Sequence, residues 1–231
     1  MLTSTKTILL CAATRWEAGP LARALSLSRH DDGCYEGPLG NGSISLLKTG
    51  VGPAKATAAL RGMNGPALTV SAGYCGALQP DMRPGDIVAD VREADLELVK
   101  AARATAATLG LRIHFGKIAH SDRVLGRPAD KRALGTQERA GAVDMETLAI
   151  RNWAKPLGAP VLAARVVFDA LEDTLPAQIP EEENVRAHAG YALRHPQAIF
   201  GLALMGLRQW RIMPGYVRFM KQFLSSAMEI L

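Results

Sequence analysis

The chain has 231 residues, of which 48% are hydrophobic and 21% are charged, and its formal net charge is +5. These values are typical of a globular protein with one sizeable core. The basic residues form no dense tract with interleaved aromatic residues, so we expect no nucleic-acid partner. The positive charge is compatible with an anionic substrate or with a membrane surface.

The cysteines and the N-terminus indicate a cytoplasmic protein. Cys11, Cys34 and Cys75 are widely spaced and form no CxxC pair, and no His-rich pattern indicates a metal site. We therefore expect buried, reduced thiols. The apolar run from Ile8 to Ala13 is too short for the core of a signal peptide. No run of about eighteen apolar residues predicts a transmembrane helix.

The first predicted strand is the apolar run from Thr7 to Ala13, and a helix with Pro20 in its first turn is expected to follow. Glu17 would then lie just past the carboxyl end of a buried strand. Ligands of open α/β sheets bind at these strand ends. A surface position on the helix is the alternative for Glu17.

Two glycine-containing turns are expected next in the chain. The first, Gly50 to Gly52, joins a strand from Ser43 to Thr49 to a helix from Lys55 to Arg61, and such a turn lets the backbone approach a ligand closely. The second, Gly73 to Leu78, follows a strand from Ala67 to Ala72. The other expected elements are a hairpin at Asp31–Gly42, strands at Arg83–Val88, Leu111–Ala119 and Ala159–Phe168, a helix at Glu93–Leu109, a loop with a short helix at Ser121–Arg139, an acidic mobile loop at Glu172–Glu183, and a helical tail at His195–Leu231 broken at Pro214-Gly215.

The stretch from Ala142 to Ile150 is interpreted as the end of a buried strand that passes directly into a helix. Asp144 and Glu146 are two carboxylates at this junction. Glu146 could simply favour the helix dipole, or it could contact a ligand at the strand end. The buried face of the helix is expected to contain Met145, Leu148 and Ala149.

Five features in chain order carry a family resemblance. They are Glu17, the turn Lys48–Gly52, the segment Gly73–Leu78 with Gly85–Val88, the segment Val143–Glu146, and the segment Arg165–Asp169. They resemble features of the purine nucleoside phosphorylase and methylthioadenosine/S-adenosylhomocysteine nucleosidase superfamily. In the same order, these are the first-loop glutamate, the K-S-G-I-G turn, the glycine-rich turn with its GDIV strand, the ribose-binding V-E-M-E motif and the R-x-x-S-D motif. The resemblance covers roughly residues 7 to 175.

This resemblance implies an α/β, nucleoside phosphorylase-type three-layer fold, with a central mixed twisted sheet flanked by helices. Residues 1–231 would form one domain, with 196–231 as a C-terminal amphipathic helical tail. It also implies an enzyme that cleaves the N-glycosidic bond of a purine nucleoside and releases adenine. No metal or organic cofactor is implied, and a homodimer is expected by analogy.

The form of the Gly73–Leu78 turn and the apolar, basic tail resemble the hopanoid-biosynthesis-associated phosphorylases of bacteria. That branch implies phosphorolysis of 5′-substituted adenosine (adenosylhopane), with inorganic phosphate as co-substrate. Hydrolysis of the methylthioadenosine/S-adenosylhomocysteine type is the alternative. A non-catalytic nucleoside-binding or membrane-docking protein is an alternative of another class.

The resemblance assigns catalytic roles to three carboxylates. Asp169 would protonate N7 of the purine, because partial burial raises a carboxyl pKa toward a usable range; a helix N-cap is the alternative. Glu146 would bind the ribose hydroxyls and stabilise a positive sugar. Glu17 would activate water in a nucleosidase, or orient a sugar hydroxyl or the nucleophile in a phosphorylase.

Two further groups complete the expected site. The nucleophile or phosphate would be held by Arg15, Lys48 and the backbone amides of Gly50 and Gly52. Phe168 stands where the family often has a serine that steadies the acid, and Tyr74 replaces a small hydroxyl residue, which could reshape the nucleophile site. The substrate-binding residues are expected to be Met145, Asp144, Tyr74, Gly76 and Phe168.

The tail combines aromatic and basic side chains, including Trp210, Arg211 and Phe219. A basic amphipathic helix of this kind can lie in a membrane interface, which would bring the enzyme to a lipid-linked nucleoside at the inner face of the membrane. The alternative is a C-terminal helix that packs on the sheet or on a second subunit.

Overall fold

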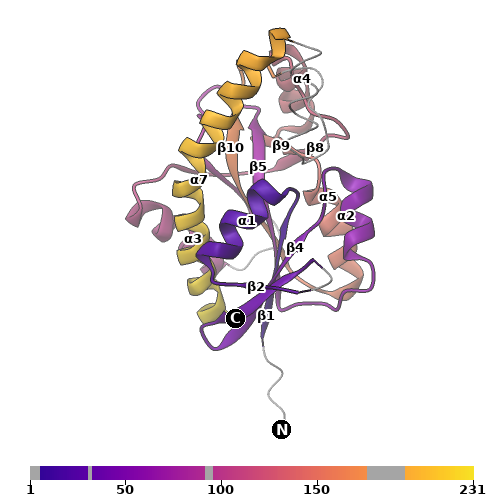
Figure 1. Ribbon diagram of the computed structural model, residues 1–231, viewed down its shortest axis with the longest axis vertical. Helices are drawn as coiled ribbons and strands as arrows, with labels where there is room; N and C mark the ends of the chain where they lie inside the picture. Colours follow the sequence, from indigo (N-terminus) through magenta and orange to yellow (C-terminus); the bar gives the residue numbers. More distant parts are fainter. Residues whose placement is uncertain (1–5, 31–32, 92–95, 176–195) are drawn as a thin grey trace.

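The computed structural model describes residues 6–30, 33–91, 96–175 and 196–231, with no account of the side chains of 196–203. Its centre is a ten-stranded mixed sheet with helices on both faces, as Figure 1 shows. The strands are β1 (Thr7–Ala12), β2 (Ser28–Arg29), β3 (Tyr35–Leu39), β4 (Gly42–Lys48), β5 (Leu68–Ala77), β6 (Ile87–Asp90), β7 (Ile113–Phe115), β8 (Ile118–His120), β9 (Ala142–Asp144) and β10 (Val161–Asp169).

The strand order is β2-β3-β4-β1-β5-β10-β6-β7, and β9 joins the end of β5 to β8. Strands β4, β1, β5 and β10 are parallel to their neighbours in this group, whereas β6 and β9 run antiparallel to β10 and β5. The carboxyl ends of four parallel strands therefore lie at one edge of the sheet.

The described helices are α1 (Arg15–Ala24), α2 (Pro53–Leu60), α3 (Leu96–Thr108), α4 (Pro128–Glu138), α5 (Thr147–Ala154), the short 3₁₀ helix η1 (Lys155–Leu157) and α7 (Pro196–Ile230). Helix α7 packs against α1 and α3 on one face of the sheet, and α2 packs against α5 on the other (Figure 1). This arrangement confirms the expected α/β fold, with a mixed sheet between two helical layers.

Several local predictions were wrong. The expected turn from Gly73 is mostly the second half of β5, because residues up to Ala77 pair with β10 and β9. The predicted strand Leu111–Ala119 is two short strands. Pro20 lies inside α1, since the helix already begins at Arg15.

The helix after β9 also begins later than predicted. It starts at Thr147, so Met145 precedes it and the spacing from Met145 does not define its buried face. Leu148 is consequently exposed, whereas Ala149 is buried as expected. All three cysteines are buried and free of disulfides.

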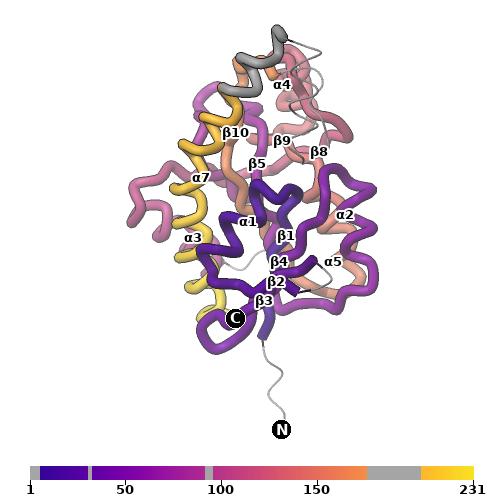
Figure 2. Tube along the Cα trace, in the orientation of Figure 1, coloured from indigo at the N-terminus to yellow at the C-terminus, as the bar shows by residue number. Residues whose placement is uncertain are grey.

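The tail forms one helix, α7, that continues through Pro214 and Gly215 instead of breaking there. Figure 2 shows its coloured part running past α1 and α3 to the end of the molecule where β3 lies. Packing explains the continuity, because the buried side chains on both sides of the proline anchor the helix to the core. They are Ile212, Met213, Tyr216, Phe219, Met220, Phe223, Leu224, Ala227 and Met228.

The second half of α7 thus follows the alternative of packing on the domain. Leu204, Leu207 and Trp210, nearer its start, are exposed. Within the described residues, no helix has both the length and the apolar character that crossing a membrane requires. Most of the predicted acidic loop Glu172–Glu183 lies outside the described residues.

Candidate active site

The second half of β5 is the centre of the site. Residues 73–76 continue the sheet beyond the end of β1 and pair with the last residues of β10. Groups from α1, from the β9–α5 junction and from β10 meet this segment. Sequence-distant carboxylates are therefore brought to one short stretch of strand.

Glu17 points inward from the first turn of α1 and is 2% exposed. One carboxylate oxygen, Oε1, accepts a hydrogen bond from the Tyr74 amide at 2.7 Å. The other, Oε2, accepts from the amide and hydroxyl of Thr14 at 2.8 and 3.0 Å and completes a capping box. Burial raises the pKa of Glu17, and the charge of Arg165 opposes this rise. Glu17 is therefore a fixed, inward carboxylate, and the alternative of a surface helix residue was wrong.

Gly73 is required by the position of Glu17. A Cβ at residue 73 would lie 2.2 Å from Glu17 Oε1, and its φ of +121° is one that other residues rarely adopt. The amide of Gly73 donates to the hydroxyl of Tyr216 on α7 at 2.8 Å, and that hydroxyl donates to the carbonyl of Ala164 at 2.8 Å. The C-terminal helix thus holds the strand at the point where Glu17 approaches it.

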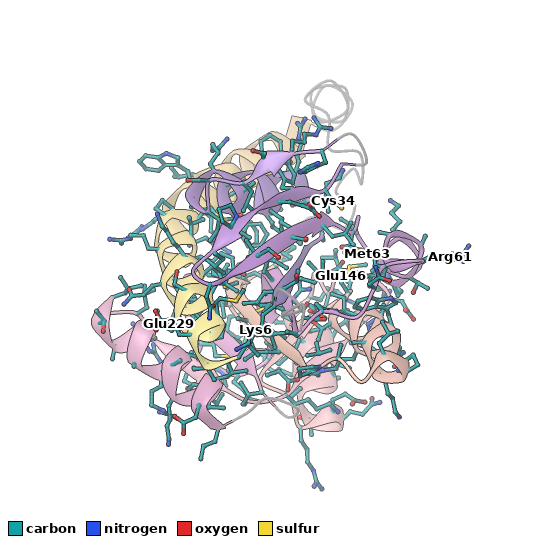
Figure 3. The ribbon with its side chains drawn as sticks, turned by 90° about the horizontal axis from the view of Figure 1, so that it is seen from below. Lys6, Cys34, Arg61, Met63, Glu146 and Glu229 are labelled. Carbon is teal, nitrogen blue, oxygen red and sulfur yellow. The ribbon has the colours of Figure 1, made fainter. Side chains whose placement is uncertain are left out.

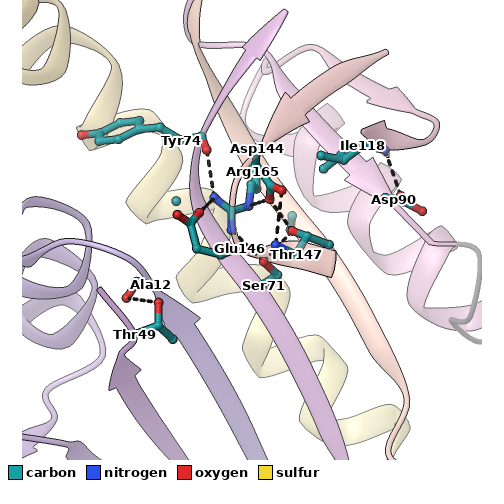
Figure 4. Close-up of polar contacts among 12 residues, drawn as sticks. Ala12, Thr49, Ser71, Tyr74, Asp90, Ile118, Asp144, Glu146, Thr147 and Arg165 are labelled. Atoms are coloured by element: carbon teal, nitrogen blue, oxygen red, sulfur yellow. Dashed lines mark hydrogen bonds and ion pairs between the residues drawn. The ribbon is translucent and has the colours of Figure 1, made fainter. Parts of the chain in front are cut away.

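Arg165 links Asp144 and Glu146, as Figure 4 shows. Its guanidinium lies 2.5 Å from Asp144 and 3.3 Å from Glu146, and it donates to the Tyr74 carbonyl and the Ser71 hydroxyl, both at 2.9 Å. It is 1% exposed. Sequence reasoning gave Arg165 no role of its own, although a single charge inside an apolar strand was a signal that buried partners exist. Asp144, expected to bind substrate, is buried and paired with Arg165.

Glu146 lies in the interior of the molecule, whereas Arg61 projects from its surface (Figure 3). The Oε1 atom of Glu146 accepts a hydrogen bond from the Gly52 amide at 2.9 Å. Burial raises the pKa of Glu146, and Arg165 opposes the rise. Although Glu146 precedes α5, its side chain makes no cap hydrogen bond. Capping the N-terminus of the helix is therefore not the role of this side chain. Met145 lies beside it, with its Cε 3.8 Å from where a Cβ on Gly52 would be.

Asp169 is the last residue of β10 and is 5% exposed. The register of β10 against β5 shifts between Val167 and Asp169, so Phe168 is an extra residue at an irregularity. Bulges of this kind re-aim side chains next to active sites. The Asp169 carboxylate reaches within 3.2 Å of the position that a Cβ on Gly76 would take. Burial raises its pKa. No helix begins there, so the N-cap alternative was wrong.

Tyr74 and Phe168 turn away from the carboxylates. Their rings meet edge to face with centroids 5.0 Å apart, and both join the core on the α7 side of the sheet. Figure 4 shows the Tyr74 side chain pointing away from Glu146 and Arg165. The expected contact of these two side chains with substrate near the carboxylates is therefore not supported by the geometry.

The model of the phosphorylase superfamily matches residues 7–91 and 89–199. The chain belongs to the phosphorylase superfamily. A 5′-methylthioadenosine/S-adenosylhomocysteine nucleosidase from Exiguobacterium sp. is 27% identical over 171 residues, which are 60% of this chain and 72% of the relative. The expected superfamily is confirmed, and the protein is an enzyme of the nucleosidase and phosphorylase kind.

Solved structures share the fold. A Helicobacter pylori 5′-methylthioadenosine/S-adenosylhomocysteine nucleosidase bound to a pyrrolidine compound superposes with a TM-score of 0.70 at 16% identity, covering 99% of this chain and 100% of that one. The native futalosine hydrolase of the same species gives a TM-score of 0.69 at 16% identity, covering 98% and 99%. At this identity the likeness concerns the fold alone.

In this superfamily member, the four residues expected to hold phosphate are only partly assembled. The Gly52 amide is already bonded to Glu146. Arg15 is exposed with its guanidinium 4.3 Å from the centroid of the Trp16 ring, and Lys48 is exposed at the end of β4. A Cβ on Gly50 would lie 3.0 Å from the Lys55 side chain. Among the described residues, no cluster of three His, Cys, Asp or Glu side chains could hold a metal ion.

Proposed function

We propose that the protein cleaves the N-glycosidic bond of a purine nucleoside and releases adenine. The observation that carries this proposal is the convergence of three buried carboxylates on residues 73–76 of β5. Glu17 bonds the Tyr74 amide, Asp169 lies against Gly76, and Glu146 reaches the same segment through Arg165.

Each carboxylate has a task in that reaction. As the bond between C1′ and N9 breaks, its electron pair moves to the purine, and Asp169 donates a proton to N7. The sugar develops positive charge, which the carboxylate of Glu146 stabilises while it accepts hydrogen bonds from the ribose hydroxyls. Met145, beside Glu146, would pack on the sugar.

Water is the nucleophile that the geometry supports best. The carboxylate of Glu17 is held by hydrogen bonds from the amides of Tyr74 and Thr14. In this position it would take a proton from the water that attacks C1′. The printed name of the Exiguobacterium relative, a nucleosidase, agrees with hydrolysis. The Gly52 amide, one expected phosphate ligand, is engaged by Glu146.

Phosphorolysis is the second candidate. Lys48 pairs with Ala12 in the register of β4 and β1, so Lys48 and the start of α1, where Arg15 lies, are at the same edge of the sheet. These two cations could hold inorganic phosphate as a co-substrate. Phosphate would then attack C1′ in place of water and remain on the sugar.

Adenine release measured with and without phosphate separates the candidates. Release in phosphate-free buffer, with an unphosphorylated reducing sugar formed, supports hydrolysis. Release only with phosphate supports phosphorolysis. No release from any purine nucleoside, with or without an apolar 5′ substituent, would overturn the enzymatic proposal and favour a binding protein.

A lipid-linked adenosine such as adenosylhopane is the finer substrate proposal, and it includes reversible contact of a cytoplasmic enzyme with a membrane. The contact region would be the start of α7, where Leu204, Leu207 and Trp210 are exposed and Arg211 is close in sequence. Removing residues 196–231 would unfold the protein, because α7 supplies core side chains. Leu207→Gln/Trp210→Gln is the appropriate variant, and unchanged sedimentation with anionic vesicles would refute membrane contact. The proposed homodimer is tested by sedimentation equilibrium.

A further inference from the structure

Lys131 on α4 is a fully buried lysine beside the candidate acid. Its side chain is 1% exposed, and its Nζ lies 2.5 Å from Asp169 Oδ2. It also donates to the carbonyl oxygens of Ala170 and Asp173 at 2.8 and 2.9 Å. A buried ammonium is costly unless it is paired and hydrogen-bonded, and Lys131 has one ion pair and two hydrogen bonds.

The titratable groups around Asp169 come from α4, from α7, from β5 and from the turn after β10. Lys131 is the cation in direct contact. Arg208 of α7 also favours the ionised form of Asp169, but it donates to the Asp173 carboxylate at 2.7 Å and to the Phe168 carbonyl at 3.2 Å. Asp173 repels the negative charge on Asp169. The charge on Asp169 in turn raises the pKa of the Cys75 thiol on β5. Lys131 is therefore the group best placed to fix the Asp169 carboxylate.

We propose that Lys131 is a positioning residue for Asp169. Its ammonium group holds the Asp169 carboxylate, and its hydrogen bonds to two carbonyl oxygens fix the turn that follows β10. Phe168, the residue before the acid, offers no side-chain hydrogen bond, because its ring packs on Tyr74. The polar partner that the acid needs comes instead from α4. This inference rests on the proposed function, since it concerns how the acid of that reaction is held.

The pairing also sets the pH range of the reaction. Lys131 favours the ionised form of Asp169 and so lowers its pKa, against the rise that burial causes. Asp169 must be protonated to act as the acid, so activity is lost as pH rises through its pKa. Removing the charge of Lys131 raises this pKa, and the alkaline limb of the pH profile moves to higher pH.

The experiment compares pH profiles of adenine release for the full-length protein and for Lys131→Gln, whose amide can still donate to the carbonyl oxygens. We expect the alkaline limb of kcat/KM to move up by about one to three pH units, as loss of an adjacent opposite charge implies. We also expect kcat to fall by roughly 10- to 100-fold from loss of alignment, with a smaller change in KM. Arg151→Gln is the matched control, since it removes another buried cation, the partner of Asp90 at 3.0 Å. Its alkaline limb should match that of the wild type.

Further variants make the outcome decisive. In an Asp169→Asn background, Lys131→Gln should cause no additional loss of kcat, because its effect passes through Asp169. An unchanged alkaline limb in Lys131→Gln, or a full additional loss in the double variant, would overturn the positioning role. If Lys131→Gln does not fold, Lys131→Met replaces it. Failure of both to fold while Lys131→Arg folds would show that the charge serves the fold alone, which also overturns it.

These results are distinguishable from failure of the proposed function. If the wild type releases no adenine, or if Asp169→Asn turns over normally, the acid assignment fails before Lys131 is considered. If Asp169→Asn is impaired while Lys131→Gln keeps the wild-type pH profile, only the role of Lys131 fails.

Discussion

Substituting Gly73 by alanine tests whether the position of Glu17 matters to the reaction. The new Cβ would lie 2.2 Å from Glu17 Oε1 and 2.7 Å from its carboxyl carbon. Contacts below 3.0 Å are essentially not seen, so the carboxylate must retreat by about 0.8 Å. A retreat of that size breaks or stretches the 2.7 Å hydrogen bond from the Tyr74 amide. A misplacement of about 1 Å costs on the order of 100-fold in rate, and we expect a fall in kcat of that size.

Backbone strain must be separated from this displacement. The φ of +121° at Gly73 is unfavourable for alanine and should cost about 1–3 kcal/mol of stability on its own. Gly158→Ala provides the control, because Gly158 also has a positive φ, +65°, but nothing lies within 4 Å of the new Cβ. This control should lose stability but keep its kcat.

The assay is steady-state adenine release, with thermal unfolding measured on the same samples. We expect Gly73→Ala to lose both stability and turnover, and Gly158→Ala to lose stability alone. If Gly73→Ala unfolds at a lower temperature but keeps wild-type kcat, the location of Glu17 is irrelevant to the chemistry. The assignment of Glu17 as the base would then be refuted.

Three further predictions concern the acid, the base and the C-terminal helix. Asp169→Asn should lower kcat by roughly two or more orders of magnitude, the scale of lost general acid catalysis, and near-normal turnover would mean that another group is the acid. Burial raises the pKa of Glu17 above 4.5, and a base must be ionised, so activity should fall on the acid side at a pH above that value. Glu17→Gln should abolish this acid limb, and a surviving limb would assign it elsewhere. Tyr216→Phe removes the hydroxyl that bridges Gly73 and Ala164, so the free energy of unfolding should fall by about 1–3 kcal/mol in chemical denaturation.

Short motifs in the sequence predicted that three acidic side chains would lie close together, and the structure brings them to one stretch of β5. Glu17 and Asp169 lie at the ends of the parallel strands β1 and β10, which meet at one edge of the sheet. Glu146 follows β9, which runs antiparallel to β5, so strand direction alone did not predict its place. The resemblance of their surroundings to one superfamily pointed to the same three positions. Local pattern and overall fold therefore agree at these residues.

The partners of these acids were harder to predict, because they depend on contacts between distant elements. Lys131 lies between Asp130 and Arg132 in a polar helix, and nothing local distinguishes it from these less buried neighbours. It is buried because its side chain reaches Asp169 at the end of β10 and the turn that follows. The glycines at 73 and 76 likewise indicated a turn, whereas pairing with β9 and β10 extends the strand through them.

The bridge from Tyr216 to Gly73 also affects when the enzyme can first work. A ribosome makes β5 before α7, so a nascent chain carries Glu17, Glu146 and Asp169 before it carries the hydroxyl that ties this strand in place. Premature termination within α7 would remove core side chains together with this tie. We therefore expect adenine release only from chains in which α7 has been synthesised and has packed.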